Sequence, residues 1–503
     1  MRIFRRPNTP LGALTLAVAA FAVAVLLFVG FGTLQVTRTV VAVSSDPFRD
    51  LPFILTPSSE GLGRQSGVAG AFARGDRVNL LLLGYGGAGH DGPFLTDSLM
   101  LVSLDGIEGT ATLISVPRDL WVTIPKGKYN SAFQAKINEA FAIGGNHGDR
   151  DEGMRLAAEV VSDVLGLKIE RTLALDFRAF RTVVDRIGGI EVNVERAFSS
   201  IYPASDTDES WIDIAFKAGP QHMDGETALR YSRARYADGI EGSDFARSAR
   251  QQRVIFATRD KVASTGAFQT LLGLLDALRD NVRTDLSLSD MRVLGDVAKN
   301  YDDARAARGA LTNQNLLQNF NIRFADGVGF TLQPRVDGFG EVRAYVRRLI
   351  ERPGSLGEDP LVAVQVSARR SNAGDQAVDR LSDLGFRARL EIVAGEDPSA
   401  TVVSGGAVDS VGFLAGYFAG YRAETAGTVV VRLGTDWQPP RLFTSTFAPV
   451  ALPTPVTPSP VPSISPPPTP TPRPSSTPVP GVSTGPGPSV RPSQSLAPTA
   501  ADR

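Results

Sequence analysis

The chain has 503 residues, of which 43% are hydrophobic, enough to build two or three domains with a large core. Its formal net charge of −1 argues against a general nucleic-acid-binding protein, which would carry a basic surface. The absence of cysteine excludes disulfide bonds and thiolate metal sites.

The N-terminal stretch predicts a membrane anchor. Leu11–Phe31 carries no charge and is mostly apolar, and at about 1.5 Å per residue it can cross a hydrocarbon core of roughly 30 Å. Arg2, Arg5 and Arg6 precede it, so the positive-inside rule places the N-terminus in the cytoplasm. A cleaved signal peptide is the alternative, but its apolar core would be shorter, about 7–15 residues. We therefore expect residues 1–34 to form a cytoplasmic tip and a single transmembrane helix in the cell membrane, with the rest of the chain extracytoplasmic.

Residues 78–350 predict an α/β domain. Three short apolar runs, each bounded by turn residues, have the length of buried strands: Val78–Leu83, Leu99–Leu104 and Thr110–Val116. Apolar residues recur at helical spacing in Met154–Leu165 and Phe177–Ile187. Strands separated by such helices favour an α/β sandwich around one mixed central sheet. We expect the last part of this domain, Leu271–Ile350, to be mostly helical.

The segments around this domain differ from it in composition. Residues 35–77 contain prolines and clusters of Ser and Gly, which predicts a juxtamembrane linker. Residues 360–438 predict a smaller α/β domain that begins with a strand at Leu361–Val366. Residues 439–503 consist largely of Pro, Ser and Thr and cannot bury enough apolar surface to offset ordering entropy, so we expect a disordered tail.

Charged residues and glycines follow the predicted strands of the first domain. A Gly-rich loop that carries His90 and Asp91 leads from the first strand to Asp97. Arg118 and Asp119 close the third strand. Polar groups at strand ends, with glycines that let the backbone approach a ligand, are how an α/β sheet builds a site at its edge.

Several motifs in a fixed order resemble the LytR-CpsA-Psr (LCP) family. They are T-D-S before an apolar run, S-V-P-R-D, K-I-N-E-A, V-D-R-I-G-G-I-E-V-N-V, and A-L-R-Y-S-R-A-R-Y followed by S-D-F-A-R-S-A-R-Q-Q, within roughly Val78 to Val262. The resemblance implies an extracytoplasmic transferase that moves a glycopolymer from a polyprenyl-diphosphate carrier onto peptidoglycan. Residues 360–438 resemble the LytR C-terminal domain, although Ala368–Gly374 stands where that domain usually has an Asn-Gly turn.

A diphosphate calls for arginines, whose planar fork binds phosphate bidentately and stays charged. Any single arginine here is more often a surface residue that is solvated or in an ion pair, but the family motifs imply that a set of five binds the diphosphate. Lys136 would balance phosphate charge, and Gln251 shares a predicted helix face with two of the arginines. We expect catalytic roles for Arg118, Asp119, Asp97, Arg235 and Arg247, and substrate binding by Lys136, Asn138, Arg233, Asp244, Arg250 and Gln251.

The resemblance also implies a metal ion, Mg²⁺ or alternatively Mn²⁺, because hard cations bridge carboxylates and substrate phosphates. Asp97 stands in the T-D-S motif that supplies one ligand. The second family carboxylate is missing, since Gly86 occupies its position. We expect Asp91 to replace it; His90 is less suited because imidazole prefers softer metals.

The mechanism that these residues predict is displacement at the anomeric carbon of the sugar, with Mg²⁺ and the arginines stabilising the leaving diphosphate. Asp119 would orient Arg118 or cap the strand end, and Asp244 could cap a helix or face the site. The general base stays open between Asp91 and Asp119. Two other functions remain: a lipid-diphosphate hydrolase that uses water as acceptor, and a non-catalytic polyprenyl-phosphate-binding envelope regulator.

Overall fold

The computed structural model describes residues 67–204, 210–265, 278–299, 306–324 and 327–443, all within the first of the two units of the chain, Met1–Leu452. The predicted anchor at residues 1–34, most of the linker at residues 35–77 and nearly all of the tail at residues 439–503 lie outside these ranges. Within the described ranges, no helix is long and apolar enough to cross a bilayer.

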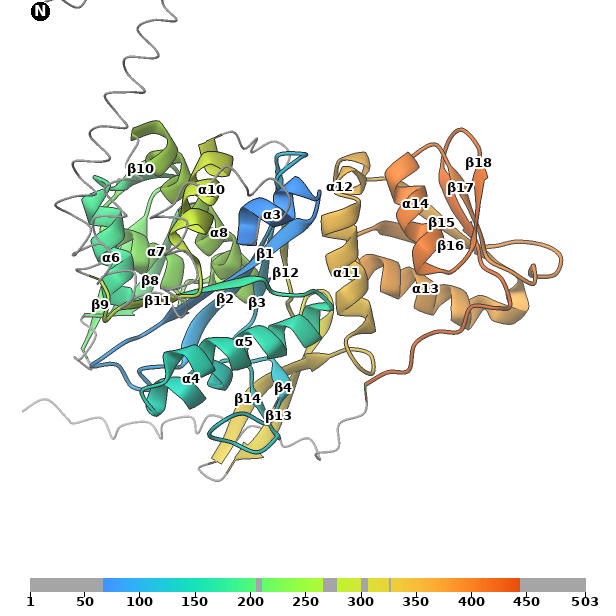
Figure 1. The fold of residues 1–503 in the computed structure, drawn as a ribbon. Helices are drawn as coiled ribbons and strands as arrows, with labels where there is room; N and C mark the ends of the chain where they lie inside the picture. Colours follow the sequence, from blue (N-terminus) through green and yellow to red (C-terminus); the bar gives the residue numbers. More distant parts are fainter. Residues whose placement is uncertain (1–66, 205–209, 266–277, 300–305, 325–326, 444–503) are drawn as a thin grey trace, which may run out of the picture. The chain divides into compact units, whose positions relative to one another are not determined.

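A mixed sheet lies at the centre of the first domain, as predicted (Figure 1). Its strand order is β11-β6-β1-β2-β3-β12. The strands β1, β3, β6 and β12 run in one direction, and β2 and β11 run in the other. The three apolar runs of the sequence are confirmed as β1, β2 and β3. The bounds of the strands are Arg77–Tyr85 (β1), Thr96–Asp105 (β2), Thr110–Val116 (β3), Arg171–Asp176 (β6), Val282–Thr284 (β11) and Ala307–Ala310 (β12).

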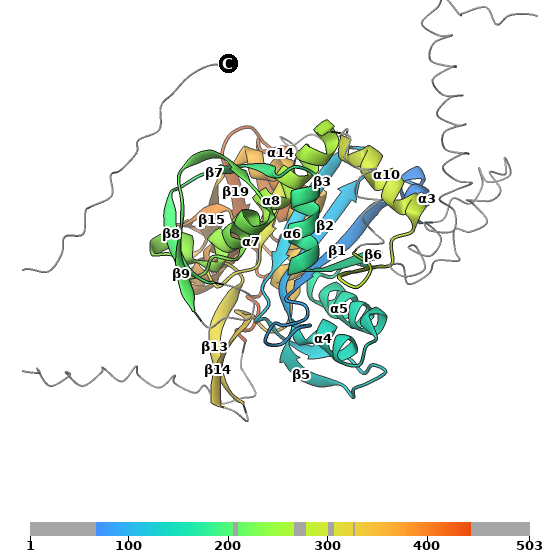
Figure 2. The same ribbon diagram turned by 90° about the vertical axis from the view of Figure 1, so that its left-hand side faces the viewer.

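Helices cover both faces of this sheet, which is the predicted α/β sandwich (Figures 1 and 2). Leu81 and Leu83 of β1 belong to a core with α4 (Glu139–Asn146), α5 (Arg150–Leu165) and α11 (Gly340–Glu351). Leu80 and Leu82 point to the opposite face, toward α3 (Gly67–Ala73), α8 (Asp244–Thr265) and α10 (Leu288–Lys299). Every residue of β3 is buried, the polar Thr110, Thr112 and Ser115 among them, so the strand is covered on both faces and its sequence lacks the alternation of a half-exposed strand.

A second layer covers the face of the central sheet to which Leu82 points. It consists of helices α6 (Phe177–Arg186), α7 (Gly225–Arg233) and α8 (Asp244–Thr265), and of two hairpin-like sheets with a hydrophobic core of their own. Asp176 begins α6 by accepting a hydrogen bond from the backbone N of Ala179 (2.8 Å). The strands of the two small sheets are β7 (Ile190–Val194) with β10 (Gly219–Met223), and β8 (Phe198–Pro203) with β9 (Trp211–Phe216).

The remaining elements complete the two α/β regions. The second region has a five-stranded sheet with the order β16-β15-β19-β17-β18; its resemblance to the LytR C-terminal domain stays a prediction. Elements of the first region are α3 (Gly67–Ala73), β4 (Trp121–Ile124), β5 (Phe133–Lys136), η1 (Gly239–Gly242), α10 (Leu288–Lys299), β13 (Leu317–Phe324) and β14 (Gly327–Pro334). Those of the second are α12 (Gly354–Glu358), β15 (Leu361–Val366), η3 (Ala368–Arg370), α13 (Ser371–Asp383), β16 (Arg387–Ile392), β17 (Val402–Gly405), α14 (Val408–Tyr417), β18 (Tyr421–Glu424) and β19 (Val429–Arg432).

Two sequence-based expectations about these elements were wrong. The predicted linker includes α3, whose buried Val68 and Ala71 pack near Leu286; seven residues are too few to show a helical period. Leu271–Ile350 is not mostly helical, because it contains β11, β12, β13 and β14 in addition to α10 and α11. Strands of three or four residues, such as β11 and β12, leave no readable alternation in a sequence.

The contact between α4 and α5 gives a test of the packing. A Cβ on Gly153 would overlap the carbonyl oxygen of Phe141, because the two helices approach closely there. Gly153→Ala is therefore expected to lower the free energy of unfolding by about 2 kcal/mol through overpacking. Gly416→Ala is the matched control, since a Cβ there meets nothing within 4 Å and alanine favours a helix. Urea unfolding of both variants checks this; equal midpoints would contradict the close approach.

Candidate functional site

Charged side chains meet at one edge of the central sheet because of the directions of its strands. Strands β1, β3 and β6 end at this edge, and β2 begins there. Leu99 of β2 pairs with Val116 of β3. Asp97 and Arg118, each two residues beyond that pair, therefore lie opposite each other.

A β-bulge sets the direction of Asp97. Gly84 pairs with Ser98 and Tyr85 pairs with Thr96, which leaves Asp97 without a partner in β1. In a regular strand Asp97 and Ser98 would point to opposite faces. The bulge breaks this alternation, so both side chains line the same cavity.

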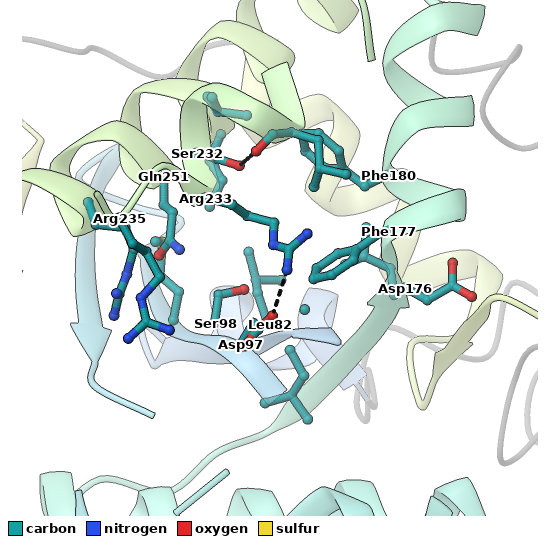
Figure 3. A pocket seen from close by; sticks show the side chains of 18 of the residues that line it. Leu82, Asp97, Ser98, Asp176, Phe177, Phe180, Ser232, Arg233, Arg235 and Gln251 are labelled. Atoms are coloured by element: carbon teal, nitrogen blue, oxygen red, sulfur yellow. Dashed lines mark hydrogen bonds and ion pairs between the residues drawn. The ribbon is translucent and has the colours of Figure 1, made fainter. Parts of the chain in front are cut away.

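The cavity has a volume of about 420 Å³ and lies between the sheet and the layer of α6, α7 and α8 (Figure 3). Four arginines and two aspartates are its charged lining residues, so the lining is positive on balance. Most of the other lining side chains are apolar and come from the sheet and from all three helices. They include Leu82, Met100, Leu173, Leu175, Phe177, Phe180, Val183, Val184, Leu229, Val254 and Ile255.

Asp97 holds two of these arginines. One carboxylate oxygen, Oδ1, accepts a short hydrogen bond from Nη1 of Arg118, and the other, Oδ2, lies 3.4 Å from Nη2 of Arg233 (Figure 3 shows the second contact). Burial by itself would lower the pKa of Arg118, but Asp97 and Asp119 raise it above its usual value. Arg118 therefore stays charged, and its guanidinium is fixed before any ligand arrives.

Aromatic side chains position Arg233, the last residue of α7. Its guanidinium carbon lies 3.9 Å from the centroid of the Phe177 ring, a distance typical of a cation–π contact. Its Nη1 donates a hydrogen bond to the hydroxyl of Tyr202 (2.9 Å). Neither aromatic residue was predicted, because their contribution depends on α6 and the β8–β9 hairpin meeting α7 in space.

Asp119 joins Arg118 to Lys136. Nζ of Lys136 lies 2.7 Å from Oδ1 of Asp119, and Nε of Arg118 lies 3.5 Å from Oδ2. Burial would raise the pKa of Asp119, but the hydrogen bond from Lys136 and the charges of Arg118, Lys136 and Arg235 lower it. The predicted role in orienting Arg118 agrees with this geometry. Neither Asp119 nor Lys136 lines the cavity.

The lowered pKa of Asp119 predicts an acid-dependent stability. Its ionised form stabilises the fold above the usual pKa of an aspartate, about 4, and this contribution is lost as the pH falls through the folded-state pKa. Asp119→Asn is therefore expected to lower the free energy of unfolding by about 1–2 kcal/mol at pH 7, with the difference shrinking in acid. Urea unfolding at pH 7 and near pH 3 measures both values, with the exposed Asp91→Asn as control. A difference that grows in acid would contradict the ion pair.

Asn138 is buried, and its backbone connects the strands near the site. Its N donates to the carbonyl oxygen of Arg118 (3.3 Å), and its carbonyl oxygen accepts from the N of Thr96 (3.3 Å). Its side-chain Oδ1 is buried and has no hydrogen-bond partner among the described residues. Asn138 therefore supports the backbone next to the site, and it is not one of the residues that line the cavity.

Helix α8 and the segment after α7 bring the other predicted residues together. Arg235, Arg247 and Gln251 all line the cavity, and Arg235 is exposed (Figure 3). Asp244 at the start of α8 forms an ion pair with Arg247 (2.8 Å). Partial burial lowers the pKa of Arg247, and the nearby positive charges of Arg235 and Arg118 act in the same direction. The three arginines repel one another, and a bound anion would reduce this repulsion.

The predicted substrate contact of Arg250 is contradicted. Its side chain is 0% exposed and does not line the cavity. It donates to the carbonyl oxygens of Tyr231, Ala234 and Glu241 and to Oε2 of Glu241, over distances of 2.6–3.0 Å. On a helix Arg250 lies about 60° to one side of Arg247 and Gln251 about 40° to the other, so a shared face does not extend to all three. Through its hydrogen bonds to Tyr231 and Ala234, Arg250 holds the C-terminal end of α7 in place.

Asp91 does not line the cavity that Asp97 faces. Glycines with positive φ, among them Gly87 (+86°) and Gly92 (+64°), fold the loop after β1 back on itself, and Asp91 is exposed there. The structure thus does not bring Asp91 into the cavity with Asp97, and the metal site expected from the two stays a prediction. The space beside Gly86 is taken by His90, because a Cβ on Gly86 would lie 2.7 Å from the Cβ and Cγ of His90.

The oxygen ligands of the cavity fit a metal ion in one arrangement, in which the substrate supplies the other ligands. Within the described ranges, no three His, Asp or Glu side chains gather to hold an ion. Asp176 accepts from the N of Ala179 and from Nδ2 of Asn281 (2.6 Å), and its carboxylate points away from the cavity (Figure 3). Asp97 is left as the carboxylate that faces the arginines. One carboxylate with substrate phosphates is a common Mg²⁺ environment, so the residues fit an ion that binds together with a diphosphate.

Known proteins share this sequence pattern. Polyisoprenyl-teichoic acid–peptidoglycan teichoic acid transferase TagV of Bacillus subtilis (strain 168) is 30% identical over 221 residues, which cover 44% of this chain and 52% of TagV. The enzyme of the same class named TagU, from Enterococcus faecalis (strain ATCC 700802 / V583), is 32% identical over 256 residues, covering 50% and 73% respectively. The chain thus spans about half the length of the first relative.

One solved structure of a relative also aligns with the chain. The crystal structure of B. subtilis TagV aligns with 55% of this chain and 98% of that chain at 24% identity, with a TM-score of 0.41. The family model described as the LytR_cpsA_psr family matches residues 57–325, more than half of the chain. Together with the 32% identity to TagU, this shows that the chain belongs to the LytR-CpsA-Psr family.

Proposed function

We propose that this protein is a membrane-anchored, extracytoplasmic transferase that moves a glycopolymer from a polyprenyl-diphosphate carrier to peptidoglycan. The observation that carries the proposal is a mostly apolar cavity of about 420 Å³ lined by Arg118, Arg233, Arg235 and Arg247. An isoprenoid chain needs an apolar slot, and a diphosphate needs cations at its side. The names of the family relatives, which are teichoic acid transferases, support the same activity.

The arginines would bind the diphosphate from several elements at once. Arg118 comes from the end of β3, Arg233 from the end of α7, and Arg247 from the first turns of α8. Asp97 holds Arg118 and Arg233 in place, so little reorganisation is needed when the anion enters. Mg²⁺, held by Asp97 and by diphosphate oxygens, would supply further neutralisation of the phosphate charge.

The reaction transfers the sugar end of the carrier to a peptidoglycan hydroxyl. Attack at the anomeric carbon would break its bond to the phosphate oxygen and release a lipid diphosphate, with the electron pair on that oxygen. Attack at the sugar-bearing phosphorus would break the bond between the two phosphates and release a lipid monophosphate. In either case negative charge would develop on the released phosphate group, and the four arginines that line the cavity would stabilise it.

The direct test supplies the full-length protein in detergent with Mg²⁺, a polyprenyl-diphosphate-linked oligosaccharide and peptidoglycan fragments. Sugar joined covalently to peptidoglycan is the expected product, and its absence with Asp97→Asn would tie it to this cavity. Mass analysis of the released lipid separates the two bond cleavages. Released sugar or phosphate without linkage to peptidoglycan would indicate a hydrolase, and carrier binding without any product would indicate a non-catalytic regulator.

A further inference from the structure

Two exposed aromatic side chains line the cavity beside the arginines. Trp211 at the start of β9 is 50% exposed, and Tyr236, which follows Arg235 directly, is 58% exposed. We propose that Trp211 and Tyr236 form a binding platform for the first pyranose ring attached to the diphosphate. This inference rests on the proposed transferase function and names the residues that recognise the sugar.

The two rings are held in a defined corner. Their centroids are 5.3 Å apart and their planes meet at 83°, so one ring stands nearly upright beside the other. The backbone N of Tyr236 donates to Oγ of Ser200 in β8 (3.2 Å), which ties Tyr236 to the hairpin that carries Trp211. Trp211 pairs in that hairpin with Pro203, which also lines the cavity.

The corner lies next to the groups that would hold the phosphates. Tyr202, the neighbour of Pro203, accepts a hydrogen bond from Arg233 (2.9 Å), and Arg235 adjoins Tyr236 in the chain. A diphosphate that contacts Arg233 and Arg235 carries two groups, the isoprenoid chain and the sugar. The buried apolar side chains of the cavity suit the isoprenoid chain, which leaves the exposed Trp211 and Tyr236 to the sugar. The C–H bonds on one face of a pyranose carry a small positive charge and match the negative face of an aromatic ring, while the hydroxyls stay in water.

The exposed carboxylate of Asp213 disfavours a membrane surface as the occupant of this corner. Asp213 lies two residues after Trp211 in the same strand. Anionic lipid head groups would repel this carboxylate. Solitary exposed aromatic residues need no explanation, but two in contact at the edge of a cavity mark a ligand-binding position.

The test compares two soluble probes that share the same diphosphate diester. One is farnesyl diphosphate linked to N-acetylglucosamine, and the other is farnesyl diphosphate capped by a methyl group. Calorimetry on the full-length protein in detergent with Mg²⁺ is expected to show about tenfold tighter binding of the sugar-bearing probe. Trp211→Ala and Tyr236→Ala should each remove most of this preference and leave the affinity for the methyl-capped probe unchanged. Trp211→Phe should retain part of it.

Tyr421→Ala is the matched control, because Tyr421 is 69% exposed but lies in β18 of the second sheet. It should leave both affinities unchanged. Equal affinity of the wild-type protein for the two probes, or equal weakening of both by Trp211→Ala, would overturn the platform and leave the transferase proposal standing. Failure of the wild-type protein to bind either probe would overturn both.

A second measurement tests whether Trp211 contacts the membrane instead of a sugar. The full-length protein in nanodiscs with doxyl-labelled lipid is compared with Trp211→Phe, and the difference in fluorescence reports on Trp211. Trp211 in contact with lipid would be quenched, which would replace the sugar platform by a membrane-docking face. Fluorescence unchanged by the label is the result expected.

Discussion

Arg118→Ala is expected to lower the rate of glycopolymer transfer by about 10²–10³-fold while leaving the thermal unfolding temperature nearly unchanged. The side chain belongs to the segment after β3 and is a quarter exposed, as is its partner Asp97, so its removal leaves no buried cavity. Under the proposed function, the variant would lack a positive charge that stabilises the negative charge developing on the released phosphate. Initial rates and thermal unfolding of the same preparation measure the two effects.

Arg118→Lys refines this expectation. Lysine keeps the positive charge but cannot bridge two oxygens with a planar fork, so partial activity is expected. Arg196→Ala is the control, because Arg196 is an exposed arginine at 3.8 Å from Glu241 and does not line the cavity. Full transfer activity in Arg118→Ala would remove this residue from the site.

Arg250→Ala is expected to have the largest effect on stability, a loss of about 3–5 kcal/mol in the free energy of unfolding. The buried guanidinium satisfies three backbone carbonyl oxygens and a carboxylate oxygen of Glu241, and it lies 4.7 Å from the ring centroid of Phe198. Truncation leaves the buried carbonyl oxygens of Tyr231 and Ala234 without this donor and removes one of the two ion pairs of Glu241. Urea unfolding measures the loss.

The neighbouring arginine provides the contrast. Arg247→Ala, one turn earlier on α8, should retain most of the stability and lose activity, because Arg247 lines the cavity. If Arg250→Ala unfolded like the wild-type protein and yet lost carrier binding, the sequence-based role of Arg250 would be restored.

The sequence predicted the parts of the fold that local patterns determine. Strands β1 to β3 could be predicted because short runs dominated by apolar residues and bounded by turns are typical of buried strands. Asp97 and Arg118 could be placed at one edge because both stand at strand ends. The bulge in β2 could not be predicted, because it depends on how β1 and β2 pair and not on the sequence of β2 alone.

Other features of the site depend on contacts between distant segments. Arg247 and Arg250 are alike in type and lie on the same helix, and a rotation of about 60° decides which one meets the cavity. Asp91 stands in the right loop for a metal ligand, but glycine conformations carry it to the surface. Trp211 and Tyr236 are 25 residues apart in the sequence and become neighbours through the hairpin and the end of α7.

The bulge at Asp97 has a consequence for variation within this architecture. Asp97 lies opposite Arg118 through the pairing of β2 with β3, and it has no partner in β1. The loop of residues 86–95 enters β2 just ahead of the bulge. The exposed part of this loop around Asp91 does not line the cavity, so it can change without moving Asp97 or the regular pairs behind it. For the proposed transferase, this arrangement would let the exposed loop adapt to different polymers while the phosphate-binding edge of the sheet stays the same.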